Sequence, residues 1–151
     1  MCSSGGKIEL WELVASEAGD DDFLLADPVV NIEQEDREMT CHCWGVGDTV
    51  FAGSDSGEIV QINARTGKRS TGSNWLAVCD GPVTAMSLTL KHVVVGSGDG
   101  QIVWVQTQSG NLAVGLSSPW VHGGVCSISF SPGYETMLLG STAGAVYQVS
   151  P

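Results

Sequence analysis

The fifteen residues from His92 to Gln106, H-V-V-V-G-S-G-D-G-Q-I-V-W-V-Q, hold two short apolar runs around a glycine-rich centre. The runs are Val93-Val94-Val95 and Ile102-Val103-Trp104-Val105, and Gly96-Ser97-Gly98-Asp99-Gly100 separates them. β-Branched and aromatic residues favour strands, and Asp-Gly favours a tight turn, so the stretch predicts a β-hairpin. Because the runs are continuous and not alternating, both faces of these strands are expected to be buried.

This hairpin pattern recurs twice more along the chain. Gly53–Ile62 and Gly140–Val149 have the same shape, and the corresponding glycines Gly57, Gly100 and Gly144 are 43 and 44 residues apart. An alternating segment of strand character precedes each hairpin, at Met39–Trp44, Val83–Leu88 and Val125–Phe130. A fainter copy, Gly6–Glu12, matches only the second half of the hairpin.

A period of 40 to 45 residues with several strands per repeat is typical of β-propeller blades. Blades stack face to face, which explains the unbroken apolar runs. We therefore predict an all-β fold, a partial WD40-like β-propeller of about three four-stranded antiparallel blades. The chain is read as one partial domain, residues 1–151. The end of one blade plus an acidic connection covers 1–38, and the repeats cover 39–82, 83–124 and 125–151.

The repeats resemble WD repeats, in which a G-S-x-D-G hairpin leads to a strand that ends in Trp-Asp. Trp11-Glu12 comes nearest to that pair, while Ile62-Asn63, Val105-Gln106 and Val149-Ser150 occupy the corresponding positions. The Gly-His pair that usually precedes the innermost strand of this family is also absent. The fold prediction therefore depends on the period and the strand pattern more than on the family signature.

Several strands outside the hairpins are also predicted. Lys7–Leu13 reads as one strand, and Phe23–Ala26, Asn74–Cys79 and Leu112–Leu116 are candidate outer strands. Since known propellers have about four to eight blades, three repeats do not close a ring. We expect either a piece of a longer propeller, which is favoured, or a chain completed by copies of itself or by a partner.

The net charge is −11, and nine of the 17 acidic residues lie between Glu17 and Glu38. Such a charge disfavours direct binding to nucleic acid or to an anionic membrane surface, because both need Lys and Arg. Within this segment Asp20, Asp21 and Asp22 lack the spacing and central glycine of a calcium-binding loop. A solvated loop, or a patch that contacts a basic partner, is the favoured interpretation, and no metal site is predicted.

The five cysteines occur in strand-like apolar contexts, which indicates reduced, buried thiols in a cytoplasmic protein. Cys41-His42-Cys43 looks like a metal cluster, but neighbouring side chains of a strand point to opposite faces. Strand alternation would place Met39, Cys41 and Cys43 on one face and His42 on the other. Core packing is therefore favoured over metal binding.

No catalytic constellation is recognisable, because the three histidines lie in three different repeats without a nucleophile motif. The favoured function is a non-enzymatic scaffold for protein–protein interactions. The alternative is a propeller enzyme or small-ligand binder of the quinoprotein type, whose polar ligands would converge on the central channel. No cofactor is predicted. The candidate partner contacts are Trp120, the basic residues Arg65, Lys68 and Arg69, and the acidic residues Asp20, Asp21 and Asp22.

Residues 39–150 also resemble the WD repeats of cilia- and flagella-associated proteins of the axoneme. The resemblance rests on Cys41-His42-Cys43-Trp44 before Val50–Gly57, on Gly96–Gly100 and on Gly124–Phe130. It implies a structural role in the cilium or flagellum, in a larger complex associated with microtubules. Since tubulin is acidic, contact with it would be mediated by another protein or confined to Arg65–Arg69.

Overall fold

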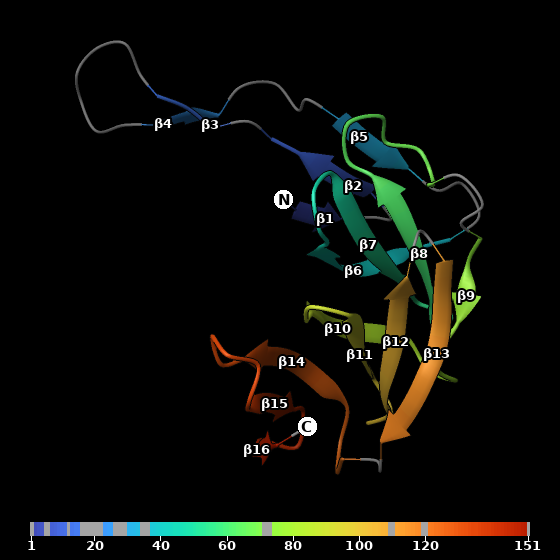
Figure 1. The fold of residues 1–151 in the computed structure, drawn as a ribbon, viewed down its shortest axis with the longest axis vertical. Helices are drawn as coiled ribbons and strands as arrows, with labels where there is room; N and C mark the ends of the chain where they lie inside the picture. The colour runs from blue at the N-terminus through green and yellow to red at the C-terminus, as the bar shows by residue number, and fades with distance from the viewer. Residues whose placement is uncertain are drawn as a thin grey trace.

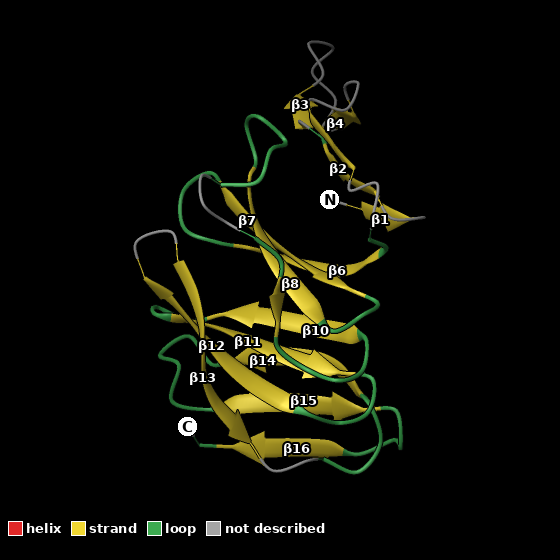
Figure 2. Ribbon diagram, turned by 90° about the vertical axis from the view of Figure 1, so that its right-hand side faces the viewer, coloured by secondary structure: helices red, strands yellow, loops and turns green. Residues whose placement is uncertain are grey.

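The computed structural model describes residues 2–4, 7–11, 13–15, 23–25, 30–33, 37–70, 74–108, 111–118 and 121–150. The described part contains strands and no helix, and every strand pairing is antiparallel (Figure 1). The three sheets that hold β6 (Met39–Trp44) to β16 (Val146–Val149) lie one upon the next, and the sheets do not close into a ring (Figure 2). This architecture confirms the predicted all-β fold of partial propeller blades.

Three successive sheets contain the three predicted hairpins. We call them sheets I, II and III, in which strands that are consecutive in sequence lie side by side. Sheet I contains β6 (Met39–Trp44), β7 (Thr49–Ser54), β8 (Glu58–Asn63) and β9 (Leu76–Ala77). Sheet II contains β10 (Val83–Leu88), β11 (His92–Ser97), β12 (Ile102–Gln108) and β13 (Asn111–Ser118). Sheet III contains β14 (Val125–Phe130), β15 (Met137–Ser141) and β16 (Val146–Val149).

The hairpin of sheet II has the predicted form. β11 and β12 pair with Val94 opposite Trp104, and Gly100 closes the turn with a φ of 95°. A positive φ is strained for residues with a side chain, so glycine is favoured here. Five consecutive residues of β11, from Val93 to Ser97, are buried. The prediction that these strands are covered on both faces is therefore confirmed.

The N-terminal region differs from the prediction. β1 (Cys2–Ser4) pairs with β2 (Lys7–Leu10), so both halves of a hairpin are present. The outer strand of this sheet is β5 (Val30–Glu33), which pairs with β2. The predicted strand at Phe23–Ala26 is present as β4 (Phe23–Leu25), but it is not the outer strand of this sheet, because it pairs with β3 (Leu13–Ala15) in a separate two-stranded sheet.

Each apolar core lies between two sheets. Between sheets I and II, Phe51 and Ile59 pack against residues of the next sheet, namely Val83, Val93, Val95, Val103 and Val105. Between sheets II and III, Val94 and Ile102 occupy the corresponding positions, and they pack against Val125, Met137 and Leu139. Burial of apolar area makes the main favourable contribution to folding. Each sheet therefore depends on its neighbour to complete its apolar core.

Each innermost strand carries a β-bulge near its first residue, where the register shifts by one position. The bulges lie between Met39 and Cys41, between Val83 and Ala85, and between Val125 and Ser127. The bulge overturns one prediction. Met39 packs toward the N-terminal sheet with Ile8, whereas Cys41 and Cys43 pack toward sheet II. An extra residue reverses the alternation of faces, so Met39 does not share a face with the two cysteines.

The residue in each of the first two bulges bridges to the following sheet. The hydroxyl of Thr40 donates a hydrogen bond of 2.5 Å to the carbonyl oxygen of Val83. Thr84 donates in the same way to the carbonyl oxygen of Val125. The third bulge holds Cys126, whose side chain is exposed. Two successive sheets are thus joined by a side chain to backbone bond at the same position of the repeat.

A glycine accompanies each of these bridges. A Cβ atom built on Gly53 would lie 2.5 Å from Cγ1 of Val83, and one built on Gly96 would meet Val125 equally closely. The absence of a side chain therefore lets the innermost strand of the next sheet approach. Sheet III has Gly140 at this position, and its apolar residues Leu138 and Val146 are 45% and 74% exposed. Their counterparts in sheet II, Val94 and Ile102, are buried against sheet III.

We predict that Gly53→Ala lowers the free energy of unfolding by about 1–3 kcal/mol, because the added methyl group overpacks the contact with Val83. Gly133→Ala is the matched control, since its nearest neighbour would be the Cγ of Glu135 at 3.6 Å, an ordinary contact. Urea denaturation followed by circular dichroism measures both. Equal stabilities of the two variants would contradict the role assigned to Gly53.

Candidate protein-interaction surface

The antiparallel strand order places two kinds of turn at opposite ends of the strands, and therefore on opposite sides of the stacked sheets. We call one the turn end, formed by residues 45–48, 64–69, 89–91 and 131–136. Hydrogen bonds hold these turns in place. The amide of Ala64 donates to the carbonyl of Asp48 at 2.7 Å, and the amide of Thr107, which lies in β12, donates to the carbonyl of Lys91 at 3.1 Å. The other, the hairpin end, holds the glycine turns at 55–57, 98–100 and 142–144. The two ends differ in their side chains.

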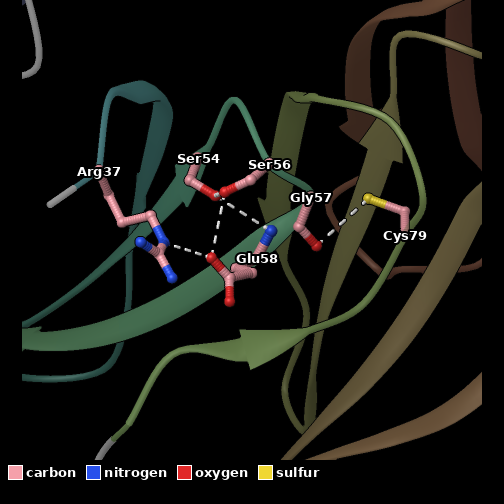
Figure 3. Close-up of polar contacts among 6 residues, drawn as sticks. All are labelled: Arg37, Ser54, Ser56, Gly57, Glu58 and Cys79. Carbon is pink, nitrogen blue, oxygen red and sulfur yellow. Dashed lines mark hydrogen bonds and ion pairs between the residues drawn. The ribbon is translucent and has the colours of Figure 1, made fainter.

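Buried serines organise the hairpin end. In sheet I, the amide of Glu58 donates to Oγ of Ser54 at 3.1 Å, and Ser56 lies 3.1 Å from the same oxygen (Figure 3). Arg37 reaches across to Glu58, with 2.5 Å between Nε and Oε2, and the thiol of Cys79 points at the carbonyl of Gly57 (Figure 3). Polar groups of this end are therefore engaged with one another and with the turn backbone.

The same serine recurs in the other two sheets. The amide of Gln101 donates to Oγ of Ser97 at 3.0 Å, and the amide of Ala143 donates to Oγ of Ser141 at 3.1 Å. Ser141 in turn donates to the backbone carbonyl of His122, and not to its imidazole ring. Buried hydroxyl groups need such partners. These hydrogen bonds give the three serines a structural role in holding the hairpins.

The turn end exposes large apolar side chains. Val46 is 77% exposed, Leu90 is 79% exposed, and both lie on turns that join the innermost strand to the second strand. Trp44 and Tyr134 are also exposed at this end. Tyr134 has a φ of 57°, a conformation that is uncommon for a residue with a side chain. Exposed apolar groups that gather on one surface mark interaction sites more often than single exposed residues do.

A pocket of about 240 Å³ opens at the turn end between sheets II and III. Its aromatic wall is a chain of ring contacts. His92 and Trp104 meet edge to face with ring centroids 5.9 Å apart, and Trp104 and Phe130 do so at 6.0 Å. Phe130 continues to Tyr134 at 6.0 Å. The rest of the lining comes from Thr89, Leu90, Lys91 and Gly133.

A second pocket, of about 160 Å³, lies in the preceding groove between sheets I and II. It shares Thr89 and Leu90 with the aromatic pocket. Its remaining lining mixes apolar and hydrogen-bonding side chains, namely Val46, Thr49, Phe51, Gln61, Leu88 and Thr107. Leu90 therefore forms a ridge between two neighbouring grooves.

Charge is distributed unevenly between the ends. Four of the six Lys and Arg residues, Arg65, Lys68, Arg69 and Lys91, belong to the turn end, against two acidic residues, Asp48 and Glu135. The hairpin end and the residues next to it have one basic residue, Arg37, against five acidic residues, Glu38, Asp55, Glu58, Asp80 and Asp99. In a chain of net charge −11, the turn end is thus a local basic surface.

The predicted contact residues divide between described and undescribed parts of the chain. Arg65 pairs with Asp48, with 2.6 Å between Nε and Oδ2, and Arg69 lies over the ring of Trp75 at 5.8 Å. Lys68 is exposed beside them. Trp120, Asp20, Asp21 and Asp22 lie outside the described residues. Sequence reasoning missed Leu90, Lys91 and Tyr134, which no motif marks and which only the stacking of sheets brings together.

The Cys41-His42-Cys43 segment packs as strand alternation indicates. Both cysteines contact the core between sheets I and II, and burial raises the pKa of each thiol to about 12. His42 lies opposite Ala52, its pKa is lowered chiefly by burial, and its Nδ1 atom is buried without a hydrogen-bond partner. In the described part of the chain, no three His, Cys, Asp or Glu residues are grouped so that they could hold a metal ion.

Among the described residues, no helix is long and apolar enough to span a membrane.

Comparisons with known proteins place the chain among propeller-like folds. The chain matches 43% of a chain in the crystal structure of a mitotic checkpoint complex, over 98% of its own length, with a TM-score of 0.73 and 13% identity. It also matches 72% of the computationally designed Ika4 protein over 82% of its length, with a TM-score of 0.65 and 18% identity. These identities are low, so the structural matches show the fold alone. No protein-family model matches the chain.

One curated relative is similar in sequence. It is cilia- and flagella-associated protein 43 of Xenopus laevis, which is 27% identical over 116 residues, or 70% of the chain. The matched region spans 7% of the length of that relative. The similarity is weak, and it agrees with the resemblance to ciliary WD repeats noted in the sequence.

We predict that iodoacetamide at pH 8 alkylates Cys126 well before Cys41 and Cys43. Cys126 is exposed, whereas partial burial raises the pKa of the Cys41 and Cys43 thiols to about 12, so few of them are present as the reactive thiolate at pH 8. Peptide mass mapping over time measures the order. In guanidinium chloride the three rates should converge, and rapid native-state labelling of Cys43 would contradict the packing described above.

Proposed function

We propose that this chain is a non-enzymatic scaffold that binds proteins through the turn end, and that it serves as a structural component of the ciliary or flagellar axoneme. One observation carries the proposal: the turn end combines exposed apolar side chains with four of the six basic residues. Interfaces commonly pair apolar anchors with a charged rim. A rigid stack of sheets presents such a surface without an ordering cost on binding.

The ciliary part of the proposal draws on sequence similarity. The relative from Xenopus laevis is named as a cilia- and flagella-associated protein, and the residues that resemble ciliary WD repeats lie in sheets I to III. The net charge of −11 disfavours direct contact with an acidic polymer such as the tubulin surface. We therefore expect a mediating protein complex between this chain and the microtubule doublet.

Co-sedimentation tests this function. We predict that the labelled chain pellets with axonemal doublets that retain their associated complexes, and that salt-extracted doublets do not retain it. Arg65→Gln with Lys68→Gln should weaken binding about fivefold, because exposed charges contribute modestly and additively. Raised salt should weaken binding further, since these charges are screened.

The matched control carries the same loss of charge elsewhere. Ala77→Glu with Ala143→Glu lowers the net charge equally at two exposed positions outside the turn end. This variant should bind like the wild type. Failure of the wild-type chain to pellet with complete doublets would overturn the axonemal role. A bound metal or chromophore in the purified protein would instead support a propeller enzyme or small-ligand binder.

A further inference from the structure

The aromatic pocket between sheets II and III is not a necessary product of the repeat. At the position of Trp104 the other two sheets have Gln61 and Gln148, and at the position of His92 they have Thr49 and Thr136. Equivalent backbone positions are therefore filled by amides and hydroxyls where no aromatic pocket forms. The pocket is a local feature of one groove, and the stacking of sheets does not account for it.

The dimensions of the pocket limit what it can hold. Its volume of about 240 Å³ lies below the range of roughly 300–1,000 Å³ typical of pockets for small-molecule ligands. A single side chain of a partner is a better match than a cofactor or metabolite. Four aromatic rings, including the imidazole of His92, and Leu90 supply the walls, so the preferred side chain is apolar.

The charge of the residues that line the pocket further limits the class of ligand that it can bind. Aromatic pockets can also hold cations, including methylated lysine. Here Lys91 is part of the lining, and its ammonium group would repel a cationic ligand. The neighbouring basic residues Arg65 and Lys68 lie at the same end. An acidic residue next to the apolar side chain would find a complementary charge on Lys91.

We propose that the turn end binds a segment of a partner protein in which an apolar side chain is flanked by acidic residues. The apolar side chain enters the pocket formed by His92, Trp104, Phe130 and Tyr134, and a carboxylate pairs with Lys91. The segment crosses Leu90, the ridge shared with the second groove, where Thr49 offers a hydroxyl group. Since packed sheets lie about 10 Å apart, three residues of extended chain span the two grooves. This inference rests on the proposed function and names the partner's chemistry.

Selection from a library of random peptides tests the inference. A phage-displayed library of random heptapeptides is selected on the immobilised full chain, and the enriched peptides are then measured by fluorescence anisotropy. We predict that they contain Leu, Met, Phe or Trp next to Asp or Glu. Leu90→Asp should weaken binding of the enriched peptides about tenfold, because it places a carboxylate between the grooves. Lys91→Glu should weaken it about fivefold.

Two control variants match these changes. Leu116→Asp alters a leucine on β13 that is exposed to a similar degree, 74%, and Lys7→Glu reverses the charge of an exposed lysine on β2, outside the turn end. Both should bind the peptides like the wild type, and circular dichroism should show all four variants folded. Enrichment of basic peptides, no enrichment, or equal effects of test and control variants would overturn the inference. Retained co-sedimentation with doublets in any of these cases would leave the proposed function standing.

Discussion

Neighbouring sheets approach closely where a glycine of one faces a valine of the next, and the rest of the architecture depends on that contact. Val83 sits against Gly53, and Val125 sits against Gly96. Two twisted sheets can approach this closely only where one of them lacks a side chain. The contact fixes the separation of the sheets, brings the bulge residues Thr40 and Thr84 within reach of the next backbone, and closes the apolar cores between successive sheets.

The turn end and the hairpin end differ in the surroundings that they give their side chains. At the hairpin end the chain reverses at buried serines, so hydroxyl groups and backbone amides satisfy one another. At the turn end, Val46 and Leu90 do not fold back into a core. Exposing the Val46 and Leu90 side chains to water costs free energy. The fold itself does not require apolar side chains at these positions, so their exposure indicates another role. This contrast supports the proposal that the turn end is the binding surface, while the serines give the hairpin end a structural role.

The sequence predicts those parts of the fold that depend on the order of neighbouring residues. The apolar runs of β11 and β12, the glycine turns and the period of the repeat gave the fold class, because hairpin chemistry depends on neighbouring residues. The pairing of β5 with β2 and the reversal of Met39 were missed, since partner choice and bulges depend on contacts distant in sequence. For the site, Arg65, Lys68 and Arg69 stood out as the only basic cluster. The aromatic pocket could not be predicted, because His92 and Tyr134 are 42 residues apart and meet only across two sheets.

Thr40 and Thr84 each tie one sheet to the backbone of the next, and this arrangement has a consequence for how the protein comes apart. Interactions of this type link nearest neighbours only, so stability is approximately a sum of the stability of each sheet and of the interfaces between neighbouring sheets. Sheet II takes part in the two larger apolar cores. Sheet I shares one of these and a smaller core with the N-terminal sheet, and sheet III shares one core within the described residues. Amide hydrogens of β11 should therefore exchange most slowly, and protection should fall toward β16 as a gradient along the stack. Because each sheet interacts only with its neighbours along the stack, sheet II is expected to be the last to unfold.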